Sequence, residues 1–408
     1  MLKYFINNEY IPFNSILTLT LQLFQKYPSI LSFYQKLFPV IIVDEFQDTN
    51  FLGYALLKKL ITTNTALYLM GDALQRIYGF IGAIPNILKD CQQKYGMEVI
   101  NLKNNYRFRN NRTMLLLDYN IRKNAENFID PMVKDDAFIN LSLTENQDNE
   151  AAYVLKKCQE LIAKNDSSKV AILFRSGHNN KNTSRIIEKF DEKGIQYFYG
   201  LFSDEDDDYK NFHFDCAREF SKLLKGYRLS RLTCIKHINT IKAKYKKKSQ
   251  PLYDALINLL DIFYKRLYSE YSFRLLDDED KLILIKDTFD GFGLKQYMEY
   301  VDSRIVISTI HGAKGLEWDY VIMPDMEQYS LPSWPGFCGE CPHKSDCQLD
   351  PGSVNQKYLE ELSVFYVGFT RAKKEVLFSA SKEGITSKGD IKKRNLSCFL
   401  QLKGIKHN

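Results

Sequence analysis

The sequence predicts an α/β fold with parallel sheets and a mostly helical insertion. Short apolar runs rich in β-branched residues recur along the chain, and several end at an acid or a glycine. Such runs are typical of strands that are buried on both faces of a parallel sheet. Stretches with apolar residues at helical spacing separate them. The predicted strands are 40–43, 66–70, 170–174, 304–308 and 320–323.

Helices are expected on both sides of the first strands and in the middle of the chain. Apolar residues recur three and four positions apart in 15–38, and Pro28 divides this stretch into two predicted helices. Within 176–302 the composition changes, because an acidic run at 204–208 precedes a basic stretch that reaches Lys248. We expect this region to be a helical insertion between two strands of one α/β domain.

Composition restricts the class of protein. A chain of 408 residues with 45% apolar and 26% charged residues can bury the cores of two or three domains. No apolar stretch approaches the roughly 18 residues that span a bilayer, and the start of the chain has no signal-peptide pattern. We therefore expect a cytoplasmic protein without a membrane partner. The net charge of +6 is compatible with a nucleic-acid partner but does not require one.

The predicted strand 40–43 ends at Asp44 and Glu45, followed by Phe46-Gln47-Asp48. A carboxylate at the carboxyl end of a buried strand can hold the Mg²⁺ of a nucleotide, and a second one can polarise the attacking water. The two acids alone are equally compatible with a solvated acidic turn. Together with the next three residues, they resemble the DEFQD block, motif II, of superfamily 1 DNA helicases of the UvrD/Rep type.

Four further blocks follow in the order of that family. Residues 71–83 resemble motif III, 102–107 motif IV, 307–318 motif V and 360–373 motif VI. Residues 170–176 are similar, more weakly, to the strand that opens the second motor domain. Five blocks in the family's order leave little room for coincidence. The resemblance implies two RecA-like parallel-sheet domains, the first one incomplete, with the helical insertion in the second.

The resemblance assigns nucleotide chemistry to five residues. Asp44 would hold Mg²⁺ and Glu45 would activate the attacking water of ATP hydrolysis. Gln75 would sense the γ-phosphate, and Arg107 would reach it. Arg371 would be the arginine finger, because a planar guanidinium suits the charge spread over a transferring phosphoryl group.

Other matched residues would hold the rest of the nucleotide and the DNA. Tyr106 would stack on adenine, Gly315 would lie beside the nucleotide, and Glu317 would bind its ribose. At the DNA, two aromatic side chains would stack on bases, and a hydroxyl and an imidazole would face the backbone. Packing in the core is the alternative for the aromatic residues. The expected DNA-binding residues are Tyr78, Phe80, Thr309 and His311.

Four positions depart from the family pattern. Arg76 stands where Ser is common, and Ile81 where Arg is common. Leu362 and Ser363 replace two usual arginines of motif VI. These substitutions put in doubt a polar link between the nucleotide and DNA sites and the contacts of the motif VI helix.

The P-loop that such an NTPase needs, G-x-x-x-x-G-K-[ST], is missing. The chain has no Gly-Lys dipeptide and no glycine before Gly53. The chain is therefore the carboxyl-terminal part of a longer protein, a subunit whose P-loop comes from a partner chain, or a non-hydrolysing DNA-binding module. The retained residues that would serve γ-phosphate chemistry argue against a long loss of catalysis.

The function implied is an ATP-driven helicase or translocase that moves 3′ to 5′ on single-stranded DNA and opens duplex at a junction. The alternative is a scaffold subunit that holds DNA or a nuclease partner in a helicase or defence complex. The pathway stays open among repair, recombination, plasmid maintenance and anti-phage defence. The expected domains are 1–115 for the partial first motor domain, 116–200 with 300–408 for the second, and 201–299 for the insertion.

A cysteine-containing loop is expected at 331–351, where Cys338, Cys341, His343 and Cys347 lie close together in the sequence. Three thiols and an imidazole suit tetrahedral Zn²⁺, although Cys341 and His343 are close for simultaneous ligation. Reduced or redox-labile cysteines are the alternative. The other five cysteines are expected to be reduced packing residues. They are Cys91, Cys158, Cys216, Cys234 and Cys398.

Overall fold

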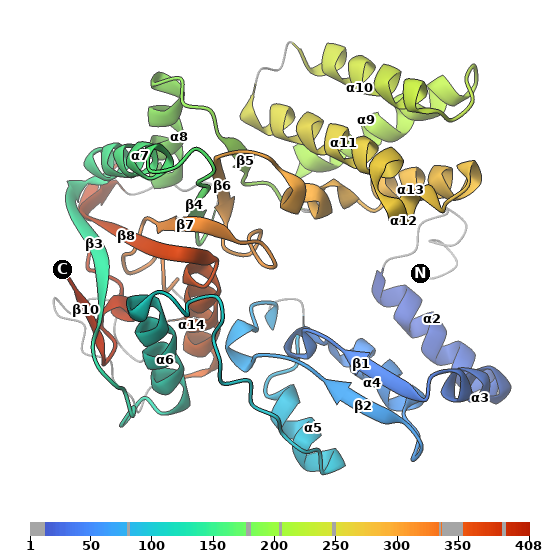
Figure 1. Ribbon diagram of the computed structural model, residues 1–408, viewed down its shortest axis with the longest axis horizontal. Helices are drawn as coiled ribbons and strands as arrows, with labels where there is room; N and C mark the ends of the chain where they lie inside the picture. The colour runs from blue at the N-terminus through green and yellow to red at the C-terminus, as the bar shows by residue number, and fades with distance from the viewer. Residues whose placement is uncertain are drawn as a thin grey trace.

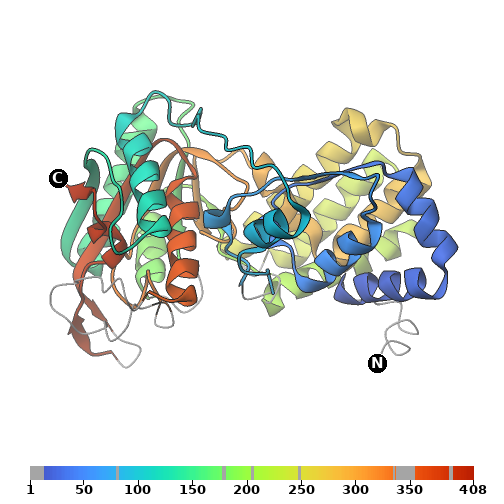
Figure 2. The ribbon, with the colours of Figure 1, turned by 90° about the horizontal axis from the view of Figure 1, so that it is seen from below.

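The computed structural model contains two parallel sheets, which lie side by side and are connected through the segment that leads into helix α6 (Figure 1; Figure 2). We call the part within 13–95 the first unit, and the parts within 112–200 and 301–408 the second unit. This architecture confirms the predicted α/β class with two parallel sheets. The structure describes residues 13–79, 82–176, 181–203, 206–246, 250–333, 336, 354–385 and 389–408.

The first unit is a two-stranded parallel sheet covered on one face. Strands β1 and β2 pair from Val40↔Ala66 to Val43↔Leu69, and Leu57 and Ile87 belong to the small core beneath them. The two helices predicted in 15–38 are present and separate at Pro28, as expected. The elements are α2 (Phe13–Lys26), α3 (Pro28–Leu37), β1 (Val40–Val43), η1 (Phe46–Asp48), α4 (Phe51–Leu60), β2 (Ala66–Leu69), η2 (Ala73–Gln75) and α5 (Ile87–Tyr95).

The expectation that strand 40–43 is buried on both faces is wrong. Successive side chains of a strand point to opposite faces, and only Ile41 and Val43 pack on the core of the first unit. Val40 and Ile42 on the other face are 50% and 61% exposed, and Tyr68 on β2 is 57% exposed. We call this the bare face of the first sheet, because nothing in the described part of the chain buries it.

The second unit contains a larger sheet with the strand order β10-β3-β8-β7-β4-β6-β5, in which all neighbours on this path are parallel. Strand β9 adds an antiparallel pair on β8. The prediction of 170–174 is confirmed residue for residue, and those of 304–308 and 320–323 are confirmed within two residues. The strands are β3 (Ala137–Asn146), β4 (Val170–Phe174), β5 (Phe198–Gly200), β6 (Ile305–Thr309), β7 (Trp318–Met323), β8 (Ala372–Ile385), β9 (Ile391–Lys393) and β10 (Ile405–His407).

Helices cover both faces of this sheet. Alternate residues of β4 explain the layering, because Ile172 packs in one apolar cluster with α7 and α8, and Leu173 in another with α6 and α14. The strand is therefore buried along its whole length, as its continuous apolar run predicted. The elements are α6 (Arg112–Glu126), α7 (Gln147–Ala163), α8 (Lys181–Glu192), α14 (Gln356–Phe369) and η7 (Cys398–Gln401).

The predicted helical insertion leaves the sheet after β5 and returns at β6. These strands are paired neighbours, so the insertion packs as its own layer beside the sheet (Figure 1). Its core is largely aromatic and includes Phe220, His237 and Tyr264. The elements are α9 (Asp207–Leu224), α10 (Arg231–Tyr245), α11 (Pro251–Ser269), α12 (Tyr271–Arg274), α13 (Asp278–Asp290) and η4 (Gly293–Tyr300).

The five scattered cysteines are reduced and buried, which confirms their prediction as packing residues. Cys338, Cys341, His343 and Cys347 lie outside the described residues, so Zn²⁺ at this loop stays a prediction. In the part of the chain that the structure describes, no cluster of three or more His, Cys, Asp or Glu could hold a metal ion. None of the described helices is long and apolar enough to cross a bilayer.

We expect the insertion to lose stability in mild acid through His237, whose Nδ1 lies 2.8 Å from the Tyr264 hydroxyl. Burial lowers the pKa of His237 to about 4 from the usual 6.5. The neutral imidazole thus contributes stability that is present above pH 6.5 and is lost as pH falls toward 4. Between pH 7 and 5 this loss amounts to about 2 kcal/mol.

Urea unfolding of wild type, His237→Gln and His407→Gln at both pH values tests this prediction. His237→Gln should show a correspondingly smaller pH dependence of the free energy of unfolding. The exposed His407 is the matched control and should leave the wild-type dependence unchanged. An equal pH dependence in wild type and His237→Gln would contradict the assignment.

Candidate nucleotide site

The first unit contributes two carboxylates at the carboxyl end of β1. Asp44 and Glu45 are both exposed, and the Glu45 amide donates to Asp44 Oδ1 at 2.8 Å. Glu45 has a left-handed backbone with φ of 49°, which turns the chain sharply away from the strand. Its Oε2 accepts a hydrogen bond from Gln47 Nε2 at 2.5 Å. The two acids therefore project from the sheet edge in a fixed turn.

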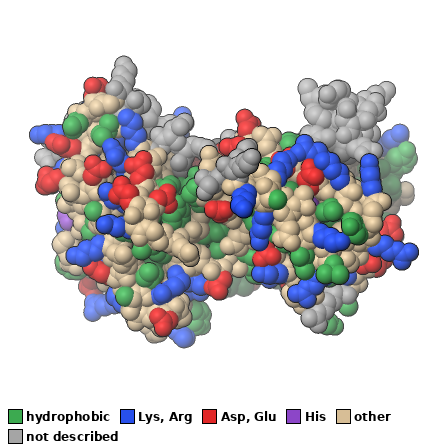
Figure 3. Space-filling model, turned by 90° about the horizontal axis from the view of Figure 1, so that it is seen from above, with side chains coloured by type: hydrophobic (Ala, Val, Ile, Leu, Met, Phe, Trp, Pro, Cys, Tyr) green, Lys and Arg blue, Asp and Glu red, His purple; other side chains and the backbone are tan. Residues whose placement is uncertain are grey.

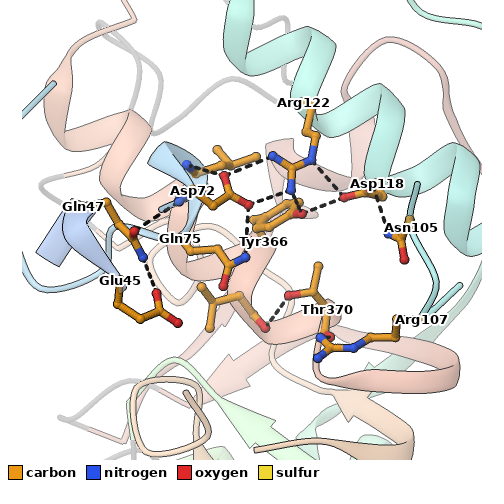
Figure 4. Close-up of polar contacts among 12 residues, drawn as sticks. Glu45, Gln47, Asp72, Gln75, Asn105, Arg107, Asp118, Arg122, Tyr366 and Thr370 are labelled. Atoms are coloured by element: carbon orange, nitrogen blue, oxygen red, sulfur yellow. Dashed lines mark hydrogen bonds and ion pairs between the residues drawn. The ribbon is translucent and has the colours of Figure 1, made fainter. Parts of the chain in front are cut away.

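Gln75 lies beside these acids because the loop after β2 is tied to the loop after β1. The Asp72 amide donates to Gln47 Oε1 at 3.1 Å, and Gln75 Nε2 donates to Asp72 Oδ2 at 3.0 Å. One glutamine, Gln47, thus bonds to Glu45 and to the backbone that carries Gln75. The structure brings together these two predicted γ-phosphate residues (Figure 4).

Lys314 reaches this end of the first sheet from the second unit. Its Nζ pairs with Asp48 and donates to the Gln75 carbonyl at 3.2 Å, and it lies 3.8 Å from Glu45 Oε2. Burial raises the pKa of Asp48, and the nearby Lys314 opposes that rise. The sequence analysis gave Lys314 no role, although it lies in the block 307–318. As the one lysine or arginine of that block, it could have been predicted to contact an acid of the site.

Arg107 and Arg371 lie together on the side of the second unit. Arg107 donates to the Thr370 carbonyl at 2.5 Å and to Glu317 Oε2 at 3.1 Å. Arg371 is buried, and its Nε donates to the Val367 carbonyl at 3.0 Å. Burial, together with the charge of Arg107, lowers the pKa of Arg371 to about 10. Two cations that repel each other in a partly desolvated place would be stabilised by an anion between them.

The acids and the arginines face each other across the two units. The negative charge of Glu45 raises the pKa of Arg371, which opposes the effect of burial. Figure 4 shows Glu45 and Gln75 on one side and Arg107 with Thr370 on the other. The five residues predicted for nucleotide chemistry therefore gather at one place.

The residues predicted for the rest of the nucleotide lie beside the arginines. Tyr106 is 71% exposed and offers a free aromatic surface. Gly315 has a left-handed φ of +83°, where a side chain would be strained. Burial alone would raise the pKa of Glu317, but Lys373 and Arg107 lower it, so its carboxylate stays ionised. Ribose binding by Glu317 and adenine stacking on Tyr106 stay predictions.

The residues predicted at the DNA lie around Lys314. Tyr78 is half-buried, and its ring centroid is 5.0 Å from Lys314 Nζ. At the end of β6, Thr309 Oγ1 accepts from the Gly312 amide at 3.0 Å. Burial and the charge of Arg175 lower the pKa of His311 to about 4, so its imidazole is neutral at pH 7. Phe80, the other predicted stacking residue, lies outside the described residues, as does Ile81.

Arg76, a departure from the family pattern, joins the two units. Its Nη2 lies 2.7 Å from Glu360 Oε1 on α14, and its Nη1 donates to the Ala83 carbonyl at 3.1 Å. The other two described departures, Leu362 and Ser363, are buried on the same helix. Leu362 and Ser363 therefore contribute to packing of α14, and Arg76 makes a contact between the units.

The fold and the candidate site indicate a class of protein: two RecA-like units with predicted nucleotide-binding residues where the units meet. The UvrD/REP helicase N-terminal domain matches residues 1–96, and the UvrD-like helicase C-terminal domain matches 213–383. The chain therefore belongs to the UvrD/Rep-type helicases.

Its relatives are longer proteins. The chain is 24% identical to a probable DNA helicase II homolog of Rickettsia conorii, over 92% of the chain and 65% of that protein. It is also 24% identical to ATP-dependent DNA helicase Rep of Escherichia coli, over 91% of the chain and 64% of that protein. ATP-dependent DNA helicase PcrA of Bacillus subtilis is 33% identical over 46% of the chain and 25% of its own length. The chain thus spans about 65% of the relatives that it matches along most of its length.

We expect Arg76→Met to weaken the contact between the units. The substitution removes a buried cation and leaves Glu360, whose side chain is 36% exposed, to be solvated by water. The free energy of unfolding should therefore fall by about 1–2 kcal/mol in urea titrations. Lys403→Gln, which removes an exposed pair with Asp130, is the control and should change it by less than about 0.5 kcal/mol. Equal effects of the two substitutions would contradict a role for Arg76 between the units.

Proposed function

We propose that the chain is the motor part of a UvrD-like, ATP-dependent DNA helicase that moves 3′ to 5′ on single-stranded DNA. The observation that carries this proposal is the convergence of Glu45 and Gln75 from the first unit with Arg371 from the second. Arg107, on the segment that connects the units, contacts Thr370 and Glu317 of the second unit at the same place. If residues from two units bind one γ-phosphate, the presence or loss of that phosphate would change how the two units are arranged relative to each other.

The residues present fit magnesium and a nucleotide. The carboxylate of Asp44 suits Mg²⁺, which commonly takes one or two carboxylates together with phosphate oxygens. Bound ATP would supply the phosphoryl group that is transferred to water. Glu45 would orient that water, and Gln75 would hold it near the γ-phosphate. Arg107 and Arg371 would offset the charge that spreads over the phosphoryl oxygens.

A connection to DNA passes through Lys314. The same ammonium group touches Asp48 and the Gln75 carbonyl on the nucleotide side, and it lies over the Tyr78 ring on the predicted DNA side. A shift of Gln75 with the γ-phosphate would move Lys314 and, with it, the face on which a base stacks. This contact supports a coupling between hydrolysis and movement along DNA.

The helical insertion offers a basic surface for DNA. Lys and Arg side chains gather over the insertion in the right half of Figure 3. On α10, Arg231, Lys236, Lys242 and Lys244 are exposed. Phosphate binding needs such cations and no base-specific contact. We propose that duplex DNA at a junction lies along this helix.

A P-loop would come from a segment other than residues 1–408, in the same protein or in a partner chain. The bare face of the first sheet supports this, because parallel sheets are ordinarily covered on both faces. A strand that pairs in parallel beside β1 or β2, with a helix over Ile42 and Tyr68, would bury this face. Its carboxyl end would lie at the same edge as Asp44, where a phosphate-binding loop is needed.

The same proposal includes the domain organisation. Residues 1–115 would form part of the first motor domain, 116–200 with 300–408 the second, and 201–299 the insertion. The two separate sheets and the helices between β5 and β6 support this division. Residues 331–351 would form the cysteine-containing loop, and a cytoplasmic location stays a prediction.

The second candidate is a non-hydrolysing DNA-binding or scaffold subunit of a nuclease, helicase or defence complex. The lack of a Gly-Lys dipeptide in the 408 residues favours it. Such a subunit would use the DNA face without hydrolysing ATP. The two candidates differ in whether ATP is hydrolysed and, therefore, in whether Glu45 is needed for that hydrolysis.

We expect Glu45→Gln to abolish hydrolysis stimulated by single-stranded DNA. Loss of the carboxylate that orients water should reduce kcat by about 100-fold or more. ATP hydrolysis would be measured for the chain alone and with a P-loop-bearing chain encoded beside it. Glu98→Gln, an exposed acid of the same region, is the control and should retain the rate. Hydrolysis that survives Glu45→Gln would come from another site, and none in either setting would favour the scaffold.

We expect DNA affinity to fall steeply with salt, whichever candidate is correct. For about four phosphate contacts on single strands, affinity should drop about 50-fold between 50 and 200 mM salt. Fluorescence anisotropy of a labelled junction with a 3′ single strand would measure it. Arg231→Gln with Lys242→Gln should reduce the salt dependence, whereas Lys156→Gln on α7 should not. An unchanged salt dependence in the double variant would exclude α10 from the interface.

A further inference from the structure

Two charged residues of α6, Arg122 and Asp118, lie at the centre of a polar network (Figure 4). Neither residue belongs to one of the sequence motifs. Arg122 donates to both carboxylate oxygens of Asp72 at 3.0 and 2.6 Å, and its Nε donates to Asp118 at 3.2 Å. The Tyr366 hydroxyl donates to Asp118 Oδ1 at 2.6 Å, and the Tyr366 ring centroid is 4.8 Å from the guanidinium carbon. The guanidinium is thus held by groups from both units.

Through Asp72, the network reaches the glutamine of motif III. The oxygen Asp72 Oδ2 accepts from Arg122 and also from Gln75 Nε2, the latter at 3.0 Å. Burial alone would raise the pKa of Asp72, but the hydrogen bonds and charge of Arg122 lower it, so the carboxylate stays ionised. Because Arg122 fixes this oxygen, it also sets the direction of the Gln75 side chain.

Through Asp118, the network reaches the arginine of motif IV. Asn105 Nδ2 donates to Asp118 Oδ2 at 3.3 Å, and Asn105 Oδ1 accepts from the Phe108 amide at 3.0 Å. Arg107 lies inside the turn that this asparagine closes. Its guanidinium donates to the Thr370 carbonyl at 2.5 Å. The position of Arg107 therefore depends on the α6 acid.

Through Tyr366, the network reaches the end of α14 that carries Arg371. Tyr366 is buried, and burial raises its pKa, so its hydroxyl stays a donor. The next residue, Val367, accepts from Arg371 Nε at 3.0 Å. Fixing Tyr366 thus fixes the helical turn on which the Arg371 guanidinium rests.

We propose that Arg122 and Asp118 are positioning residues for phosphoryl transfer, which hold Gln75, Arg107 and the Arg371 turn in one arrangement. The inference rests on the proposed function and deepens the account of the same site. A guanidinium has five donors in one plane and can serve Asp72, Asp118 and Tyr366 together, which the ammonium of lysine cannot do with the same geometry. The three groups then move into place together rather than one by one.

The first test needs no ATP. Amide hydrogen exchange of the 408-residue chain would be compared between wild type and Arg122→Gln. Exchange at 72–78 and at 105–108 should both accelerate about tenfold or more, since both loops lose their common anchor. Exchange in the buried strand β4 should not change, which shows that the variant is folded.

Arg112→Gln is the matched control for this test. It removes an arginine of the same helix that pairs with Asp135 at 2.6 Å, where both side chains are exposed. Neither loop should respond to this substitution. Acceleration of one loop alone, or of neither, in Arg122→Gln would overturn the inference.

The second test uses the preparation that hydrolyses ATP, with a P-loop-bearing chain where that is required. Arg122→Gln should lower kcat about 10- to 100-fold with KM within threefold of wild type, because misplaced groups slow the chemical step. Arg122→Lys should recover only part of kcat, since it restores the charge without the planar geometry. An unchanged kcat beside accelerated exchange, or a rise in KM alone, would overturn the positioning role. No hydrolysis in wild type would refute the proposed function, and the exchange test would still decide whether the network anchors both loops.

Discussion

Ion pairs between the units determine how the two sheets sit against each other, and in the described part of the chain three cations make them. Each pair joins a cation on one unit to a carboxylate on the other, and each lies close to a motif residue. Beside these pairs, Ile77 of the first unit is buried in the apolar core of the second, so the contact combines charged pairs with apolar packing. The pairs are Arg76–Glu360, Arg122–Asp72, and those of Lys314 with Asp48 and Glu45.

The charges of the site are unevenly divided between the units. The first unit presents the carboxylates of Asp44 and Glu45. The second presents Arg371, and Arg107 of the connecting segment is bound against it through Thr370 and Glu317. Arg371 has a lowered pKa because burial and Arg107 disfavour its charged form. An anion placed between the units would relieve that repulsion and would draw the arginines toward the first sheet. Electrostatics of this kind link ligand binding to closure of the two units.

The sequence predicted the strands that are short apolar runs, including β1 although one of its faces is exposed. Strand β4 is a continuous apolar run because both of its faces are covered, and it was predicted without error. Strands β3 and β8 were not predicted, because β3 is partly exposed and β8 carries charged residues at both ends. In the site, the motifs predicted which residues gather, but not Arg122, whose contact with Tyr366 joins residues 244 positions apart. Arg76 was identified as a departure, yet its partner Glu360 could be found only in the fold.

The strand that first indicated a nucleotide site also shows what the site lacks. Parallel strands have their carboxyl ends at one edge, and phosphate groups bind in α/β sheets beyond that edge. A further strand beside β1, with its connecting helix over the bare face, would bury Val40 and Ile42 and would bring its own loop next to Asp44. One added segment would therefore both cover the exposed apolar face and supply the missing phosphate-binding loop. We infer that whatever stabilises the first sheet also completes the site, so that stability of the first unit and nucleotide binding depend on the same segment.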